Sequence, residues 1–149
     1  MTILGWESKY RDILKEFSYS RKKDSQSCEL LNLLLTEKTR TAAIKDLIEN
    51  KPVFVVGAGP SLLSCIPILK KYKKITKIMA DGAVRAIMEN GLRPDIVVTD
   101  LDGDINELKK TGRTNNKMVV HTHGEKSDKI YIIKNLKSCI GTTQTNQTR

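Results

Sequence analysis

Asp100, Asp102 and Asp104 follow the apolar run at residues 96–98 at alternate positions. Alternate side chains of an extended chain point the same way, so this spacing predicts three carboxylates that lie close together. Crowded carboxylates repel one another unless a cation or a strong set of donors lies between them. Oxygen ligands suit a hard ion such as Mg²⁺, which also binds substrate phosphates. The segment therefore indicates either a Mg²⁺ site or an aspartate-rich turn with solvated charges.

A second candidate site is the segment Gly-Ala-Gly-Pro-Ser at residues 57–61, which follows another apolar run. Glycines at such a turn let a phosphate approach the backbone, and a following helix N-terminus supplies free N–H groups. Pro60 is typical of a first helical turn, and Ser61 could donate a hydroxyl. The segment has neither the lysine of a P-loop nor the third glycine of a dinucleotide fingerprint. Gly57 and Gly59 therefore indicate a phosphate cradle or an ordinary tight turn.

Three further polar groups follow apolar runs: Asp81 and Gly82; His121 and His123; and Thr142, Thr143 and Gln144. Two histidines without a third nitrogen or thiolate ligand at suitable spacing make a poor zinc site. Contact with a substrate, or an ordinary polar strand end, explains them better. The hydroxyl and amide groups at residues 142–144 are a weak signal by themselves.

The sequence alternates between strand-like apolar runs and segments with helical spacing, and this alternation predicts the fold that must position these groups. Short β-branched or aromatic runs predict strands at residues 53–56, 78–80, 95–99, 118–121 and 139–140, and helical spacing predicts helices at 62–72, 83–90 and 126–136. Alternating strands and helices predict an α/β fold with an open, mostly parallel sheet and helices on both faces, as in Rossmann-like proteins. Ligands of such sheets bind beyond the carboxyl ends of the strands. All the candidate groups are expected at that edge.

Residues 1–50 are expected to form a helical segment that precedes an α/β domain at 51–149. Three helices are predicted there: one over residues 6–17, a second through residues 30–35 with Ser25 or Ser27 as its cap, and a third over residues 41–49. These helices are expected to serve packing rather than chemistry.

The composition is that of a globular protein of 149 residues, with 39% hydrophobic and 29% charged residues. No apolar run approaches the roughly 18 residues that span a membrane, and the N-terminus does not resemble a signal peptide. Cys28, Cys65 and Cys139 are widely spaced and indicate reduced thiols in a cytoplasmic protein. The net charge of +9 favours polyanionic ligands, but few aromatic residues accompany the basic clusters, so specific nucleic-acid binding is not expected. Whether the chain forms a homo-oligomer is left open.

Taken in order, five segments resemble one known family. They are VVGAGPSL at 55–62, ADGA at 80–83, GLRPDIVVTDLDGD at 91–104, HTHG at 121–124 and GTTQ at 141–144. The chain resembles the archaeal 6-hydroxymethyl-7,8-dihydropterin pyrophosphokinases, which are relatives in fold of the thiamin pyrophosphokinase catalytic domain. The long segment at 91–104 is the most specific of the five.

The resemblance implies Mg²⁺-dependent transfer of the β,γ-pyrophosphoryl unit of ATP to the hydroxymethyl group of the pterin, with release of AMP, in tetrahydromethanopterin or folate synthesis. It implies roles for most of the candidate residues: Asp81, Asp100 and Asp102 in catalysis; Asp100, Asp102 and Asp104 in metal binding; Gly57, Gly59, Pro60, Ser61 and Gly82 in nucleotide binding; and His121, His123, Thr142, Thr143 and Gln144 in substrate binding. Which carboxylate acts as the base is left open.

Two departures from the family pattern matter. The family reads His-Gly-Asp-Asn where this chain has His123, Gly124, Glu125 and Lys126. Family members also continue past the Thr-Thr-Gln segment into a glycine-rich motif that contains Thr-Asp-Gly-Asp, so the chain is expected to be truncated at its C-terminus and its site incomplete.

Three alternatives remain: a thiamin pyrophosphokinase, whose acidic box usually reads Gly-Asp-x-Asp-Ser; a transferase of the kind that glycosylates flagellins; and an inactive nucleotide-binding fragment.

Overall fold

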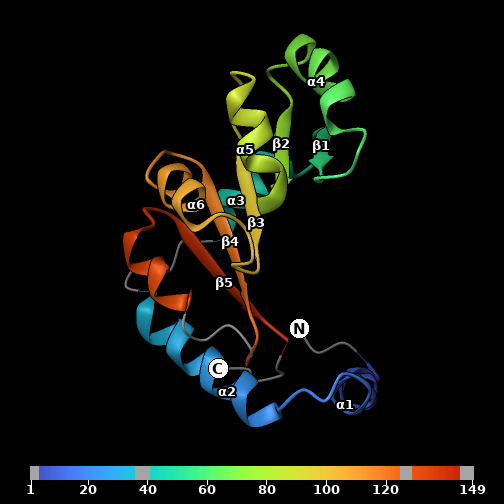
Figure 1. Cartoon of the computed structure of the whole chain (residues 1–149), viewed down its shortest axis with the longest axis vertical. Coiled ribbons are helices and arrows are strands. Elements are labelled where there is room, and N and C mark those ends of the chain that lie inside the picture. The colour runs from blue at the N-terminus through green and yellow to red at the C-terminus, as the bar shows by residue number, and fades with distance from the viewer. Residues whose placement is uncertain (1–3, 36–40, 125–128, 145–149) are drawn as a thin grey trace.

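The computed structural model describes residues 4–35, 41–124 and 129–144, and a parallel β-sheet organises them (Figure 1). Its strands are β1 (Val53–Val56), β2 (Thr76–Ala80), β3 (Ile96–Thr99), β4 (Lys117–Thr122) and β5 (Cys139–Thr143). They lie in the order β1-β2-β3-β4-β5, and every neighbouring pair is parallel. The predicted α/β fold with a parallel sheet is confirmed, and each strand overlaps the run that predicted it, with β3 beginning one residue later than predicted.

Each pair of successive strands is connected through a helix. These helices are α4 (Leu62–Lys71), α5 (Asp81–Glu89), α6 (Ile105–Gly112) and the 3₁₀ helix η2 (Lys129–Asn135). Helix α6 is not predicted by the sequence pattern. The helix predicted at 126–136 is η2 where the structure describes it, and residues 125–128 lie outside the described ranges. No helix in the described ranges combines the length and the apolar character needed to cross a membrane.

The hydrophobic core lies on the sheet face that the connecting helices cover. Met79, Val97, Met118 and Cys139 are neighbours in register and all are buried. They share one cluster with apolar side chains of α4, α5, α6 and η2. A strand order without reversal explains this arrangement, because right-handed crossovers in one direction place every connecting helix on the same face.

The opposite sheet face is covered only in part by the described residues. Helix α3 (Ala42–Ile48) reaches it, since the Leu47 carbonyl accepts a hydrogen bond from the Thr76 hydroxyl at 3.0 Å. Val55 and Val98 project from this face by the alternation of side chains, and they are 80% and 41% exposed. Helices thus lie on both faces, as predicted, but unevenly.

The N-terminal helices α1 (Trp6–Glu16) and α2 (Arg21–Leu34) confirm the predicted helical segment. Helix α2 lies beside η2 at the β5 end of the sheet, opposite the end that carries α4 (Figure 1). Its cap is Ser20, whose Oγ accepts from the Lys23 N–H, so the predicted caps Ser25 and Ser27 are wrong. Both residues lie within the helix, and Ser27 is fully buried.

Candidate functional site

The carboxyl ends of β1, β2 and β3 bring three of the predicted segments side by side. A Cβ added to Gly82 would lie 3.1 Å from the Cβ of Ala58, so the glycine turn contacts the start of α5. A Cβ added to Gly103 would lie 3.0 Å from the Cβ and Cγ atoms of Asp81. Parallel pairing produces this contact, because it places the carboxyl ends of neighbouring strands at one edge.

Asp81 joins α5 to the acidic segment. Its Oδ2 atom accepts from the Thr99 hydroxyl at 2.6 Å and from the Gly103 N–H at 3.1 Å. Its Oδ1 atom accepts from the Gly82 N–H at 2.7 Å. These three bonds fix the orientation of the carboxylate and hold the β3–α6 loop against the start of α5.

The acidic segment is a turn, so the prediction that its aspartates line one side of an extended chain is wrong. Strand β3 ends at Thr99, and Leu101 adopts a left-handed backbone conformation with φ of 69°. The Thr99 hydroxyl accepts from the Leu101 N–H at 2.8 Å, and Asp100 Oδ1 accepts from the Asp102 N–H at 3.3 Å. The Leu101 side chain is buried in the core, and its burial accounts for the reversal of the chain here.

Asp104 caps helix α6. Its Oδ1 atom accepts from the N–H groups of Asn106 and Glu107, at 2.8 and 3.2 Å. An aspartate in this position accepts hydrogen bonds from the free N–H groups of the first turn. Its negative charge also interacts favourably with the positive end of the helix dipole. This contact accounts for Asp104 without a metal ion.

The chemistry of the remaining acidic side chains fits Mg²⁺. Among the described residues, no three histidine, cysteine or acidic side chains are grouped so that they could hold a metal. Mg²⁺ does not need such a group, because it commonly takes one or two carboxylates, with waters and substrate phosphates as its other ligands. Asp100 and Asp102 supply two carboxylates in one turn, and Asp102 Oδ1 lies 3.8 Å from Lys129 Nζ. Metal binding by this segment stays a prediction.

The glycine turn after β1 is open on its outer side. A Cβ added to Gly57 or Gly59 would meet no atom within 4 Å, and neither residue has a positive φ. Neither packing among the described residues nor backbone conformation therefore requires glycine here. Pro60 and Ser61 form a turn before α4, which begins at Leu62, so the placement of Pro60 in the first helical turn is wrong.

His121 and Thr142 form a second part of the edge. They are register partners on β4 and β5, and His121 Nδ1 lies 3.0 Å from the Thr142 hydroxyl. Burial lowers the pKa of His121 below its usual 6.5, and the charge of His123 lowers it further, against opposing effects of Asp100 and Asp24. This shift favours the neutral imidazole, which has one donor and one acceptor nitrogen. Thr143 is the last residue of β5.

The predicted residues His123 and Gln144 lie beyond the ends of β4 and β5, where helix α2 contacts them. The connecting residue is Asp24, which is not among the predicted site residues. Its carboxylate accepts from the Gly124 N–H at 2.7 Å and from Gln144 Nε2 at 2.8 Å. A signal was present in the sequence, because Asp24, Cys28 and Leu31 follow the spacing of one buried helix face.

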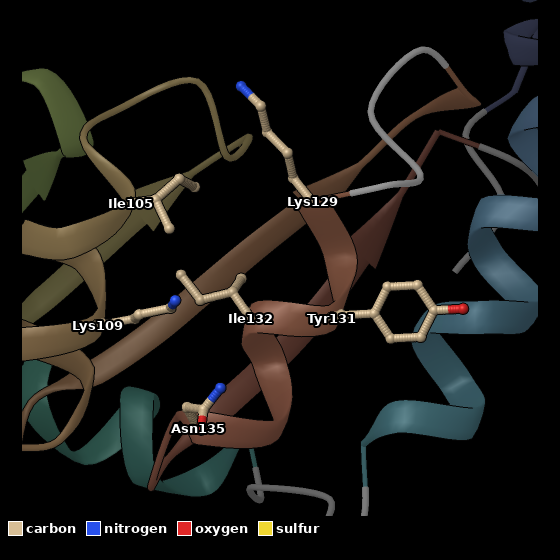
Figure 2. A pocket seen from close by; sticks show the side chains of 6 residues that line it. All are labelled: Ile105, Lys109, Lys129, Tyr131, Ile132 and Asn135. Carbon is tan, nitrogen blue, oxygen red and sulfur yellow. The ribbon is translucent and has the colours of Figure 1, made fainter.

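A pocket of about 330 Å³ lies between α6 and η2, next to the acidic turn. Its lining residues are Ile105, Lys109, Lys129, Tyr131, Ile132 and Asn135. Figure 2 shows Ile105, Lys109 and Ile132 facing the space between the two helices, whereas the Tyr131 ring points away toward α2. Lys129 connects the pocket to the acidic turn through its ion pair with Asp102.

Comparisons with known proteins agree with one another. The model of a family described as 6-hydroxymethylpterin diphosphokinase MptE-like matches residues 28–148. Proteins named 6-hydroxymethyl-7,8-dihydropterin pyrophosphokinase are 40% identical in Methanocaldococcus jannaschii, 42% in Pyrococcus furiosus and 34% in Methanothermobacter thermautotrophicus. The matches cover 97%, 94% and 97% of this chain, and 63%, 61% and 63% of the relatives. The chain thus spans about three fifths of the length of these curated relatives.

Proposed function

The chain belongs to the 6-hydroxymethylpterin diphosphokinase MptE-like family, and from this premise we propose that it transfers a diphosphoryl group from ATP to 6-hydroxymethyl-7,8-dihydropterin. Family membership confirms the resemblance found in the sequence. The observation that carries the proposal is the contact of an open glycine turn, Asp81 and the acidic turn at one sheet edge. The product of this transfer would serve tetrahydromethanopterin or folate synthesis.

The glycine turn is the proposed binding site for the phosphates of ATP. Its outer side is open at Gly57 and Gly59, so a phosphate oxygen can come close to the backbone. The turn leads into α4, and the N-terminus of a helix attracts anions through free N–H groups and its dipole. Gly82 contacts this turn and belongs to the same proposed cradle.

Asp100 and Asp102 are the proposed ligands of Mg²⁺. They are assigned in preference to Asp104, because Asp104 already caps α6. When bound, the ion would offset negative charge on the triphosphate. Lys129 supplies a further positive charge beside Asp102. Asp81, fixed by three hydrogen bonds, supports the turn that carries these ligands.

The opposite end of the edge is the proposed pterin site. His121 and Thr142 offer polar groups on neighbouring strands, and His123, Thr143 and Gln144 lie close to them in sequence. A neutral imidazole, hydroxyls and an amide suit the donor and acceptor pattern of a pterin ring better than charged groups would.

The proposed reaction needs positioning and charge neutralisation more than covalent help. The hydroxymethyl oxygen of the pterin attacks the β-phosphorus of ATP and forms a new P–O bond. The bond between the β-phosphorus and the oxygen bridging to the α-phosphorus breaks, AMP leaves with that oxygen, and the hydroxyl loses its proton. The residues at the edge orient the two substrates for this exchange.

Incubation of the protein with ATP, Mg²⁺ and 6-hydroxymethyl-7,8-dihydropterin is expected to produce AMP and the pterin diphosphate in equal amounts. Both products are measured by liquid chromatography with mass detection, and parallel reactions contain thiamin or no acceptor. AMP formed only with thiamin would contradict the proposal. So would the absence of AMP from a protein that binds Mg²⁺–ATP.

Asp102→Asn tests the assignment of the acidic turn through its affinity for Mg²⁺–ATP. The variant is expected to bind Mg²⁺–ATP at least tenfold more weakly, while its melting temperature stays within about 2 °C of the unmodified chain. Asp12→Asn is the matched control, because it removes one carboxylate from an exposed position on α1. Equal affinity in the Asp102 and Asp12 variants would remove Asp102 from the site.

A further inference from the structure

We propose that Asp24 of helix α2 is a positioning residue that holds the turn at His123 and Gly124 and the side chain of Gln144 in place for the acceptor substrate. This inference rests on the proposed function in one respect, namely that these two segments face the pterin. The arrangement itself rests on contacts among described residues.

Asp24 is a buried carboxylate whose hydrogen-bond donors come from three other parts of the chain. It is 3% exposed. Oδ1 accepts from the Gly124 N–H at 2.7 Å, and Oδ2 accepts from Gln144 Nε2 at 2.8 Å and from the Tyr10 hydroxyl. A carboxylate is costly to bury unless such donors compensate for its lost hydration. One side chain thus joins α1 and α2 to the residues that follow β4 and β5.

The two segments lie where the sheet no longer holds the backbone. Strand β4 ends at Thr122 and β5 ends at Thr143, and their last register pair joins these two residues. His123, Gly124 and Gln144 therefore lie outside the ladder. Hydrogen bonds with residues of α1 and α2, rather than strand pairing, hold these residues in position.

Further contacts from the N-terminal helices act on the same two segments. The Ser27 hydroxyl donates to the His123 carbonyl at 3.3 Å, and Trp6 Nε1 donates to the Gln144 carbonyl at 3.1 Å. The Tyr19 ring lies 6.4 Å from the His123 ring, measured between centroids. Both segments are thus held through backbone as well as side-chain atoms.

The turn at Gly124 packs closely against the backbone of α2. A Cβ added to Gly124 would lie 2.3 Å from the Cβ of Lys23, 2.8 Å from its carbonyl carbon and 2.9 Å from the Asp24 nitrogen. Because two of these atoms are backbone, no larger residue fits without a shift of the helix or the turn. The Asp24 carboxylate meets the Gly124 N–H at this contact.

This arrangement predicts separate effects on the two substrates. The glycine turn and the acidic turn make no described hydrogen bond with Asp24, whereas the segments proposed to face the pterin do. Loss of the carboxylate should therefore release His123 and Gln144 and leave the nucleotide side unchanged. A residue that only stabilised the fold would affect both sides alike.

The first test uses Asp24→Asn in the 149-residue chain, with ¹⁵N-resolved NMR as the readout. The Gly124 amide proton donates to a carboxylate over a short distance, so its resonance is expected far downfield and should move upfield in the variant. Resonances of Gly57, Gly59 and Gly82 are expected to stay in place. Glu29→Gln is the control, because it removes an exposed carboxylate from the same helix. Equal shifts at all four glycines would overturn the inference.

The second test measures binding of 6-hydroxymethylpterin by its own fluorescence and of Mg²⁺–ATP by calorimetry. Asp24→Asn is expected to weaken pterin binding at least tenfold and to change Mg²⁺–ATP affinity less than twofold. Pterin affinity equal to that of the Glu29 control would overturn the inference. If the unmodified chain binds Mg²⁺–ATP but no pterin, the proposed function fails, while the NMR result still decides whether Asp24 positions the two segments.

Ser27→Ala keeps the inference testable if Asp24→Asn does not fold. This variant leaves the carboxylate in place and removes only the hydrogen bond to the His123 carbonyl. Pterin binding is expected to weaken at least threefold in a chain that melts as a single unit. Unchanged pterin affinity would count against positioning by α2.

Discussion

The surrounding described residues do not explain why positions 57 and 59 are glycine. An added Cβ meets nothing at either position, and both residues have ordinary backbone conformations. Gly91 differs, because it follows α5 with φ of 74°, a conformation that other residues rarely adopt. The proposed ligand that approaches the backbone of the turn would explain the first two glycines, and chain geometry explains the third.

The variants Gly59→Ala and Gly91→Ala are expected to separate binding from stability. Gly59→Ala should keep or slightly raise the free energy of unfolding and weaken Mg²⁺–ATP binding at least tenfold, because its methyl group enters the proposed cradle. Gly91→Ala should lose about 1 kcal/mol of stability and keep nucleotide affinity. Urea unfolding and calorimetry measure the two effects. Normal nucleotide binding by Gly59→Ala would exclude the turn as a phosphate cradle.

At the scale of elements, α6 and α2 show that one local signal in the sequence can fit two different roles. Helix α6 begins after Asp104, whose carboxylate was interpreted as a metal ligand although it also fits a helix cap. The sequence favours packing rather than chemistry for helix α2, and the helix does pack against β4, β5 and η2. It also carries Asp24 into contact with the segments beyond two strands.

Gly124→Ala is expected to loosen α2 from the end of β4. The added methyl group would collide with the backbone of residues 23 and 24, and overpacking of this kind typically costs about 1–3 kcal/mol. Hydrogen exchange should show faster exchange in α2 than in the unmodified chain, while β1 to β3 stay protected. Gly57→Ala is the matched control, since its methyl group meets no neighbour. Equal stability of the two variants would mean that the turn and α2 are not in tight contact.

At the scale of the whole molecule, the strand order determines where the core lies. All four connecting helices share the face that carries Met79, Val97 and Met118. The other face leaves Val55 and Val98 exposed in the described part of the chain. Such asymmetry is unusual, because parallel sheets are commonly covered on both faces.

The neighbours Val97 and Val98 test this asymmetry directly. Val97 is fully buried, so Val97→Ala is expected to lower the free energy of unfolding by about 2 kcal/mol, from two buried carbons at about 0.8 kcal/mol each and a small cavity. Val98→Ala should cost less than about 1 kcal/mol, because that side chain is 41% exposed. Denaturant unfolding at two protein concentrations measures both. Equal losses would mean that both sheet faces are covered in solution.

The sequence by itself determined the class of the fold, the five strands and the edge on which the candidate residues lie. Continuous apolar runs such as residues 53–56 specify a strand locally, although Val55 of the edge strand β1 is exposed, and alternation with helices specifies parallel pairing. Parallel pairing alone then places Gly59, Asp81 and Asp100 at the same edge. These conclusions needed only patterns that repeat within a few residues.

The tertiary structure decided the geometry within that edge. The burial of Leu101 turns the acidic segment away from an extended path, and Asp24 meets Gly124 and Gln144 across separations of 100 and 120 residues. No local period encodes such contacts, because they depend on how α2 packs against the finished sheet. The carboxylates that first indicated a metal site thus belong to a turn, and the segments that follow β4 and β5 are held by a helix that precedes them in the chain.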